Sequence, residues 1–167
     1  WASGACFFIN REVYVKEGGL DAVFFAHQEE IDLCWRLHCR GYQIMAVPQS
    51  VVYHVGGATL EYESPRKTFL NFRNNLLMLY KNLPTMKWPF VMLIRLLLDY
   101  VSALQMLFAG KWLNFKAVLQ ARCAFWKLRM SYKEKRSNCI RKSKTLNPTL
   151  ISKRSIIFDY YLLGKRK

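Results

Sequence analysis

Three carboxylates gather at the start of a predicted helix, where they could take part in proton transfer. Glu29, Glu30 and Asp32 precede apolar residues at helical spacing, and Gly41 supplies a stop about three turns later. Unpaired backbone N–H groups in a first helical turn favour the ionised form of a carboxylate, which suits a general base. Acidic residues also open ordinary helices, and Asp32 is spaced to pair with Arg36 one turn on. The spacing therefore leaves a catalytic and a structural role open.

His54 is the second residue with the chemistry of a site. It ends the apolar segment of residues 51–54, which predicts a strand, and two glycines follow shortly after it. A side chain at that position can project past a sheet edge into a cleft, and neutral imidazole is a common metal ligand. Taken alone, a hydrogen-bonded structural histidine is the simpler interpretation.

The cysteines point to a reducing compartment. The chain has five, an odd number, and they lie within predicted helices or strands, so we expect no disulfide framework and a cytosolic protein. A zinc site formed by Cys34, His38, Cys39 and His54 is a weaker alternative. Cys34 and His38 can share a helix face, but Cys39 points elsewhere and no Cys-x-x-Cys pair occurs.

The elements that must position these residues follow from the apolar pattern. Short apolar runs predict three strands, at residues 5–9, 42–47 and 51–54. Helical spacing predicts five helices, at residues 11–17, about 29–40, 67–82, 89–110 and 112–130. A short apolar element at residues 156–163 closes the chain. This order predicts an α/β fold for the first part and an α-helical second part.

Charge divides the chain at the same place. Residues 1–63 hold eight acidic and four basic side chains, whereas residues 64–167 hold three acidic and twenty-two basic ones. The second part therefore carries +19 of charge and the first part −4, which together give the net +15. Such asymmetry favours a polyanionic partner for the second part, either nucleic acid or an anionic membrane surface.

The predicted helix at residues 89–110 is long enough to raise the question of a transmembrane segment. A polar stripe interrupts it at Arg95, Asp99, Ser102 and Gln105. Charges inside a single span are costly, so we expect an amphipathic helix that lies on a membrane or packs on its neighbours. The basic run at residues 132–144 is most simply a solvated, mobile segment.

Several motifs combine into a resemblance. The chain contains WASGACFFINRE, then GG-L-D-x-x-F-F, the acidic E-E-x-D-L-C-W-R, G-Y-x-I, V-P, and V-V-Y-H before Gly-Gly. In this order they resemble the C-terminal half of the catalytic domain of family-2 glycosyltransferases with the GT-A (Rossmann-like) fold, including rhamnosyltransferase-like members. The resemblance is strong over residues 1–60 and continues more weakly through N-F-R-N-N at residues 71–75.

The resemblance implies roles for particular residues. The family opens this helix with an acidic pair, usually Glu-Asp, whose second member deprotonates the acceptor hydroxyl, so Glu30 takes the place of the base. Glu29 and Asp32 are the reserve candidates, and His54 matches a histidine that completes a metal site with an Asp-x-Asp motif. The acceptor side of the cleft is matched by the opening residues of the chain, namely Trp1, Ser3 and Gly4.

The function implied is inverting transfer of a sugar from a nucleotide-sugar donor to a glycan or lipid-linked acceptor, in cell-surface polysaccharide biosynthesis. Mg²⁺ or Mn²⁺ is the expected ion. The chain contains no Asp-x-Asp and begins with Trp1, so we expect the C-terminal portion of a longer protein, inactive by itself.

The two predicted parts have different tasks. The resemblance implies that residues 1–63 form the C-terminal half of the catalytic domain, and we expect residues 64–167 to form a helical basic region that rests on the inner face of the cell membrane. No nucleic-acid signature accompanies the basic residues, so nucleic acid is not an expected partner. The alternative is a non-catalytic basic module that binds anionic lipid or nucleic acid through charge and aromatic faces.

Overall fold

The structure is a computed structural model that describes residues 1–55, 64–146 and 164. Six helices make up its regular structure, namely α1 (Arg11–Lys16), α2 (Glu29–Cys39), α3 (Pro65–Asn82), α4 (Trp88–Phe108), α5 (Trp112–Arg129) and α6 (Tyr132–Lys142). The five predicted helices agree with α1 to α5 to within three residues at each end. The apolar element predicted at residues 156–163 lies outside the described residues.

The predicted α/β fold is wrong, because the described residues contain no strand and no sheet. The segments at residues 5–9, 42–47 and 51–54 are irregular, and several of their large apolar side chains are exposed, such as Phe8 at 95% and Tyr53 at 96%. A strand is stable only when its backbone groups pair with a neighbouring strand. None of these segments pairs with another in the described residues, so they form no β-type backbone hydrogen bonds in spite of their strand-like composition. The GT-A fold expected from the resemblance is corrected accordingly.

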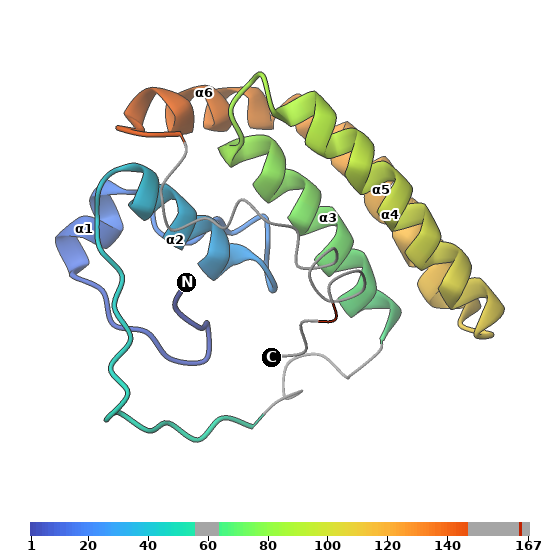
Figure 1. The fold of residues 1–167 in the computed structure, drawn as a ribbon, viewed down its shortest axis with the longest axis horizontal. Coiled ribbons are helices and arrows are strands. Elements are labelled where there is room, and N and C mark those ends of the chain that lie inside the picture. Colours follow the sequence, from blue (N-terminus) through green and yellow to red (C-terminus); the bar gives the residue numbers. More distant parts are fainter. Residues whose placement is uncertain (56–63, 147–163, 165–167) are drawn as a thin grey trace.

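Helices α3, α4 and α5 form the main body. The turn at residues 109–111 reverses the chain, so that α4 and α5 run side by side as an antiparallel hairpin (Figure 1). Helix α3 packs along α5, while α2 and α6 pack on α3. The core between them includes Tyr80, whose ring lies edge-on to Trp88 and Phe125 with centroid distances of 5.5 and 6.1 Å. In the second part of the chain, residues 64–146 are described, and they contain α3 to α6.

Local signals begin the helices at the expected places. The Ser64 side chain caps α3 by accepting a hydrogen bond from the Lys67 backbone N–H at 3.3 Å, and Pro65 occupies the first turn, where a missing N–H costs nothing. The Asn10 side chain caps α1 in the same way, by accepting hydrogen bonds from the backbone N–H groups of Glu12 and Val13. Helix α2 begins without a side-chain cap.

Helix α6 was not expected, because its sequence is so strongly charged. The structure places a helix where the sequence predicted a solvated, mobile segment, and α6 packs on α3 with Tyr132 and Cys139 buried. Two buried residues seven positions apart occupy the same face of a helix, which leaves the basic side chains outward. The exposed cations of α6 are Lys133, Lys135, Arg141 and Lys142.

The boundary predicted at residue 63 remains a prediction. Side chains of α3 bond directly to α2 and to the loop before it, so contacts cross this boundary.

Candidate active site

The loop before α2 is strained. Phe25, His27 and Gln28 adopt positive φ angles of 62°, 70° and 75°, although none of them is glycine. A side chain in the left-handed region costs on the order of 1 kcal/mol or more at each position. Three such residues within four positions persist only where the surroundings hold them, and strain of this kind concentrates at functional sites.

Asn74 of α3 holds this loop. Its Nδ2 atom is fully buried and lies 2.8, 2.8 and 2.9 Å from the carbonyl oxygens of Phe24, Ala26 and His27. The amide has two N–H groups, so three carbonyls share two donors. Arg73 adds a hydrogen bond to the carbonyl oxygen of Val23 at 2.7 Å. In the sequence, N-F-R-N-N belongs only to the resemblance. The local signal for Asn74 is that polar residues stand among the apolar positions of α3.

Asp32 is the centre of a buried polar network. Its side chain is inaccessible to solvent and accepts hydrogen bonds from Arg36 Nε at 2.9 Å, Lys81 Nζ at 2.9 Å and Asn82 Nδ2 at 2.8 Å. Arg36 in turn donates to the carbonyl oxygens of Glu17 and Gly19, beyond the end of α1. The pairing of Asp32 with Arg36 that the spacing allowed is therefore present, and this carboxylate joins α2 to α3.

Glu29 and Glu30 differ from Asp32. Both are half-buried, and the Oε2 atom of each is buried without a hydrogen-bond partner among the described residues. Burial raises the pKa of Glu29, and the neighbouring charge of Glu30 raises it further, against a hydrogen bond from its own backbone that lowers it. Burial lowers the pKa of His27, as does the charge of Lys67, while Glu30 raises it. A carboxylate accepts a proton only from a hydroxyl group that reaches it, so an acceptor has to approach the exposed part of each half-buried side chain.

The opening residues of the chain lie beside this pair. A Cβ atom built on Gly4 would lie 3.5 Å from Cδ of Glu30, so the backbone of Gly4 faces that carboxyl group. The Ala2 backbone N–H lies 3.4 Å from Sγ of Cys34 on α2. Ser3 is exposed, and so is Trp1, at 77%. The structure thus brings the predicted acceptor segment and the predicted base together at Gly4.

His54 is exposed, within an irregular segment in which every residue from 51 to 55 is exposed. In the part of the chain that the structure describes, no three His, Cys, Asp or Glu side chains gather into a group that could hold a metal ion. Cys34, His38, Cys39 and His54 therefore do not gather into the alternative zinc site, and the role of His54 toward Mg²⁺ or Mn²⁺ stays a prediction.

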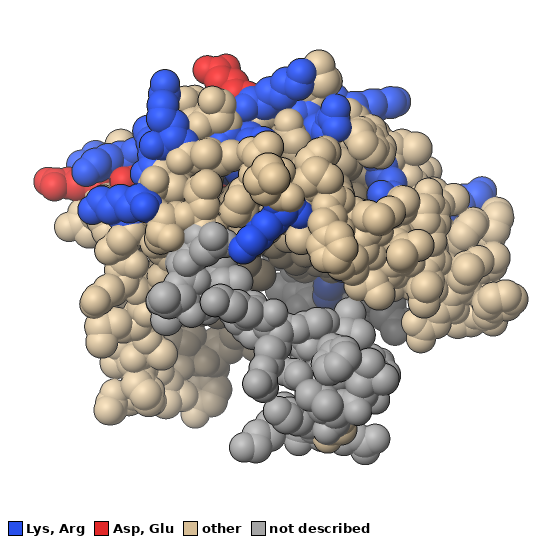
Figure 2. Space-filling view, turned by 45° about the horizontal axis from the view of Figure 1, so that its top comes forward, with Lys and Arg blue, Asp and Glu red and all other residues tan. Residues whose placement is uncertain are grey.

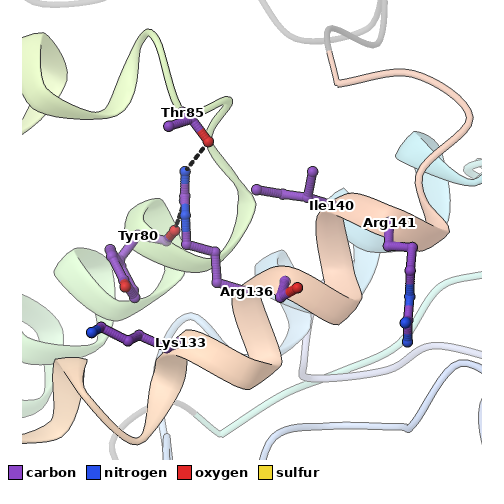
Figure 3. Close-up of a pocket in the computed structure, with 7 residues that line it drawn as sticks. Tyr80, Thr85, Lys133, Arg136, Ile140 and Arg141 are labelled. Carbon is purple, nitrogen blue, oxygen red and sulfur yellow. Dashed lines mark hydrogen bonds between the residues drawn. The ribbon is translucent and has the colours of Figure 1, made fainter.

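A separate open hollow of about 410 Å³ lies between the end of α3 and α6 (Figure 3). Its wall contains none of the predicted site residues. Arg136 crosses it to donate to the carbonyl oxygen of Tyr80 and, at 3.3 Å, to the hydroxyl of Thr85, so this cation joins α6 to the last turn of α3 and to the chain after it. The other lining residues are Lys133, Ser137, Ile140 and Arg141.

Comparison with known proteins gives a partial similarity. No family model and no solved structure matches the chain. The chain is 35% identical over 54 residues to the N-acetylglucosaminyl-diphospho-decaprenol L-rhamnosyltransferase of Mycobacterium tuberculosis, in two strains. The matched part covers 32% of this chain and only 18% of that relative. The similarity supports a glycosyltransferase as the general class and carries no detail of donor or acceptor.

Proposed function

We propose that the protein is an inverting glycosyltransferase that moves a sugar from a nucleotide-sugar to a glycan or lipid-linked acceptor in cell-surface polysaccharide biosynthesis. The observation that supports it most is the pair Glu29 and Glu30, which keeps buried carboxylate oxygens without partners among the described residues. The partial similarity to a rhamnosyltransferase supports the same class.

In this proposal Glu30 is the base. Its carboxylate accepts the proton of an acceptor hydroxyl, whose oxygen forms a new bond to the anomeric carbon of the donor sugar. The bond from that carbon to the diphosphate breaks, and the nucleoside diphosphate leaves on the opposite face, so the configuration inverts. Gly4 lies beside Glu30, because a Cβ atom at this position would lie 3.5 Å from Cδ of that residue, so a larger side chain there would contact the carboxyl group. Glu29 is the reserve base, while the network around Asp32 occupies that carboxylate.

Nucleotide release from a panel of nucleotide-sugars tests this proposal. The protein expressed from its complete reading frame is assayed with acceptor extracts, as wild type, Glu30→Gln and Glu12→Gln. Glu12 is the matched control, because it is an exposed glutamate in the first turn of α1. We expect Glu30→Gln to lose release and Glu12→Gln to retain it. Equal activity of all three would disprove the role of Glu30, and release from no donor by folded protein would favour the non-catalytic basic module.

Metal dependence is part of the same proposal, and it comes from the resemblance. His54 is the described residue that the resemblance assigns to the ion, so His54→Ala and omission of Mn²⁺ or Mg²⁺ are further arms of the assay. We expect each of them to lower release. Release that is unaffected by both would show that neither the ion nor His54 is required.

We also propose a cytoplasmic location, peripheral on the inner face of the cell membrane. The strongly basic second part of the chain supports it, since cations near an anionic leaflet are attracted by about 1 kcal/mol each. Figure 2 shows Lys and Arg side chains gathered along the top of one face of the molecule, with few acidic ones among them. Sedimentation of the protein with anionic vesicles, at low and high salt, tests this location.

A further inference from the structure

Helix α4 leaves one apolar face uncovered along its whole length. Side chains that are exposed by 49% to 87% recur in steps of three and four residues, which places them on one face. They are Phe90, Leu93, Leu97, Val101, Leu104 and Phe108. We call this set the outer stripe of α4. At 1.5 Å per residue the helix is about 31 Å long. A soluble monomer rarely exposes an apolar patch of that extent, so the stripe is suited to an apolar partner.

The acidic residue at the centre of the polar stripe of α4 lies on the inner side of the helix. Asp99 is 1% exposed and pairs with Arg122 of α5 at 2.8 Å and with Arg95 at 2.5 Å. The polar stripe predicted from the sequence thus faces the protein at Asp99, whereas Gln105 near the end of α4 is exposed. Charges that are paired inside a helix hairpin, with apolar side chains outside, are suited to an apolar surrounding.

The length and composition of α4 would allow it to cross a membrane, and it is the one helix among the described residues that passes this test. Its partner α5 opposes a crossing. Helix α5 packs along α4 and exposes Lys116, Gln120 and Lys127, which a crossing hairpin would bring into the hydrocarbon. Helix α4 can therefore enter lipid only on the side of its outer stripe, while α5 stays on the aqueous side.

Aromatic and basic side chains lie together around this hairpin. Lys116 is 5.0 Å from the ring centre of Trp112, and Arg129 is 4.8 Å from that of Trp126. Both tryptophans are about half exposed. Tryptophan and long cations of this kind favour the boundary between headgroups and acyl chains. The exposed lysines of α6 add a positive charge that complements anionic headgroups.

We propose that α4 lies in the plane of an anionic bilayer, with its outer stripe among the acyl chains just below the headgroups. This inference rests on the proposed membrane location and deepens it, because it assigns the attachment to one face of one helix. The basic residues then add electrostatic attraction, and the apolar stripe provides the contact that resists salt.

Substitutions on the stripe test the proposal more sharply than a deletion. Removing residues 85–167 would take away Met92, Phe125 and Tyr132 of the core, so such a protein would not fold. Leu97→Gln with Val101→Gln changes two side chains that are each 62% exposed, so the core is untouched. The matched control is Val15→Gln with Val51→Gln, at 66% and 73% exposure in other parts of the chain.

The measurement is flotation of the complete protein with vesicles of phosphatidylcholine, with and without phosphatidylglycerol, at low and high salt. We expect the stripe variant to partition into anionic vesicles at least about tenfold less than wild type, and the control variant to equal wild type. Binding by the stripe variant that equals wild type and disappears in high salt would overturn this inference while leaving the membrane location intact. No vesicle binding by wild type would overturn both.

Light scattering without vesicles tests the other possible partner of the outer stripe, a second copy of the chain. We expect the same mass for wild type and the stripe variant. A wild-type dimer that the stripe substitutions convert to a monomer would overturn the proposal, because the stripe would then be a protein interface. Nucleotide release with a soluble acceptor, measured on the same variants, separates these outcomes from a failure of the proposed sugar transfer.

Discussion

Two isosteric substitutions in the first turn of α2 separate a structural carboxylate from a catalytic one. Asp32→Asn and Glu30→Gln each replace one oxygen by an NH₂ group. Asp32 is inaccessible to solvent and accepts three hydrogen bonds of 2.8 to 2.9 Å, two of them from the cations Arg36 and Lys81. A neutral amide accepts at one oxygen only, so its NH₂ group would face a donor, and Arg36 and Lys81 would lose the charge of Asp32.

The magnitude follows from the burial of these groups. Breaking a buried ion pair by removing one partner costs about 3 to 5 kcal/mol. Lys81 keeps a second carboxylate, Asp21, at 3.1 Å, so we place the cost of Asp32→Asn near the lower end, at about 3 kcal/mol. Oε2 of Glu30 has no hydrogen-bond partner among the described residues, and we expect Glu30→Gln to change the free energy of unfolding by less than about 1 kcal/mol.

Urea unfolding and nucleotide release are measured on both variants. With a slope of about 1 to 3 kcal/mol per molar urea, the loss of about 3 kcal/mol lowers the midpoint of Asp32→Asn by roughly 1 to 3 M. Glu30→Gln should unfold like wild type and lose release. The reasoning fails if Asp32→Asn keeps wild-type stability while it loses release, because Asp32 would then be the base. It fails also if Glu30→Gln is destabilised as strongly as Asp32→Asn.

Three further perturbations test other parts of the site. Asn74→Asp replaces the donor that faces three carbonyl oxygens by an acceptor, so we expect the free energy of unfolding in urea to fall by about 3 kcal/mol or more. The control Asn71→Asp, at a half-buried position, should lower it by less than about 1 kcal/mol. Burial alone would raise the pKa of Asp21, but lysine hydrogen bonds lower it from 3.8 to about 2. Its ionised form therefore stabilises the fold above about pH 4 by about 2 kcal/mol, and this contribution is lost as the pH falls toward 2. The Tm of Asp21→Asn should accordingly fall less steeply than that of wild type over this range, and an identical fall would contradict the assignment. Gly4→Val places methyl groups against the carboxyl group of Glu30, so we expect a raised KM for the acceptor with unchanged stability, and an unchanged KM would remove Gly4 from the acceptor side.

The helices were predictable because their signals are local. Apolar spacing and the Ser64–Pro65 start define α3, and the acidic start with its glycine stop defines α2. The strands failed for the opposite reason. Residues 42–47 and 51–54 have the composition of strands, but a strand depends on a partner elsewhere in the chain, and composition does not reveal whether a partner exists. Helix α6 was not predicted, because most of its residues are charged or polar and its two buried positions, Tyr132 and Cys139, do not make a visible apolar pattern.

The carboxylates show where local pattern ends. Glu29, Glu30 and Asp32 are equivalent as an acidic helix start, and the sequence by itself determined that they share one turn of α2. Only the tertiary structure decided which of them accepts hydrogen bonds from other helices, because Lys81 and Asn82, which donate to Asp32, lie about fifty positions away in the chain. It likewise decided that Asn74 holds the loop before them.

The same division applies to α4. Its length and the spacing of its polar residues were determined by the sequence, since both depend on the period of a single helix. Which face turns inward was not, because that depends on a partner. Arg122 of α5 pairs with Asp99 and draws the polar side into the protein, so the apolar side faces outward. Periodicity defines the faces of a helix, and contacts between distant residues decide what each face meets.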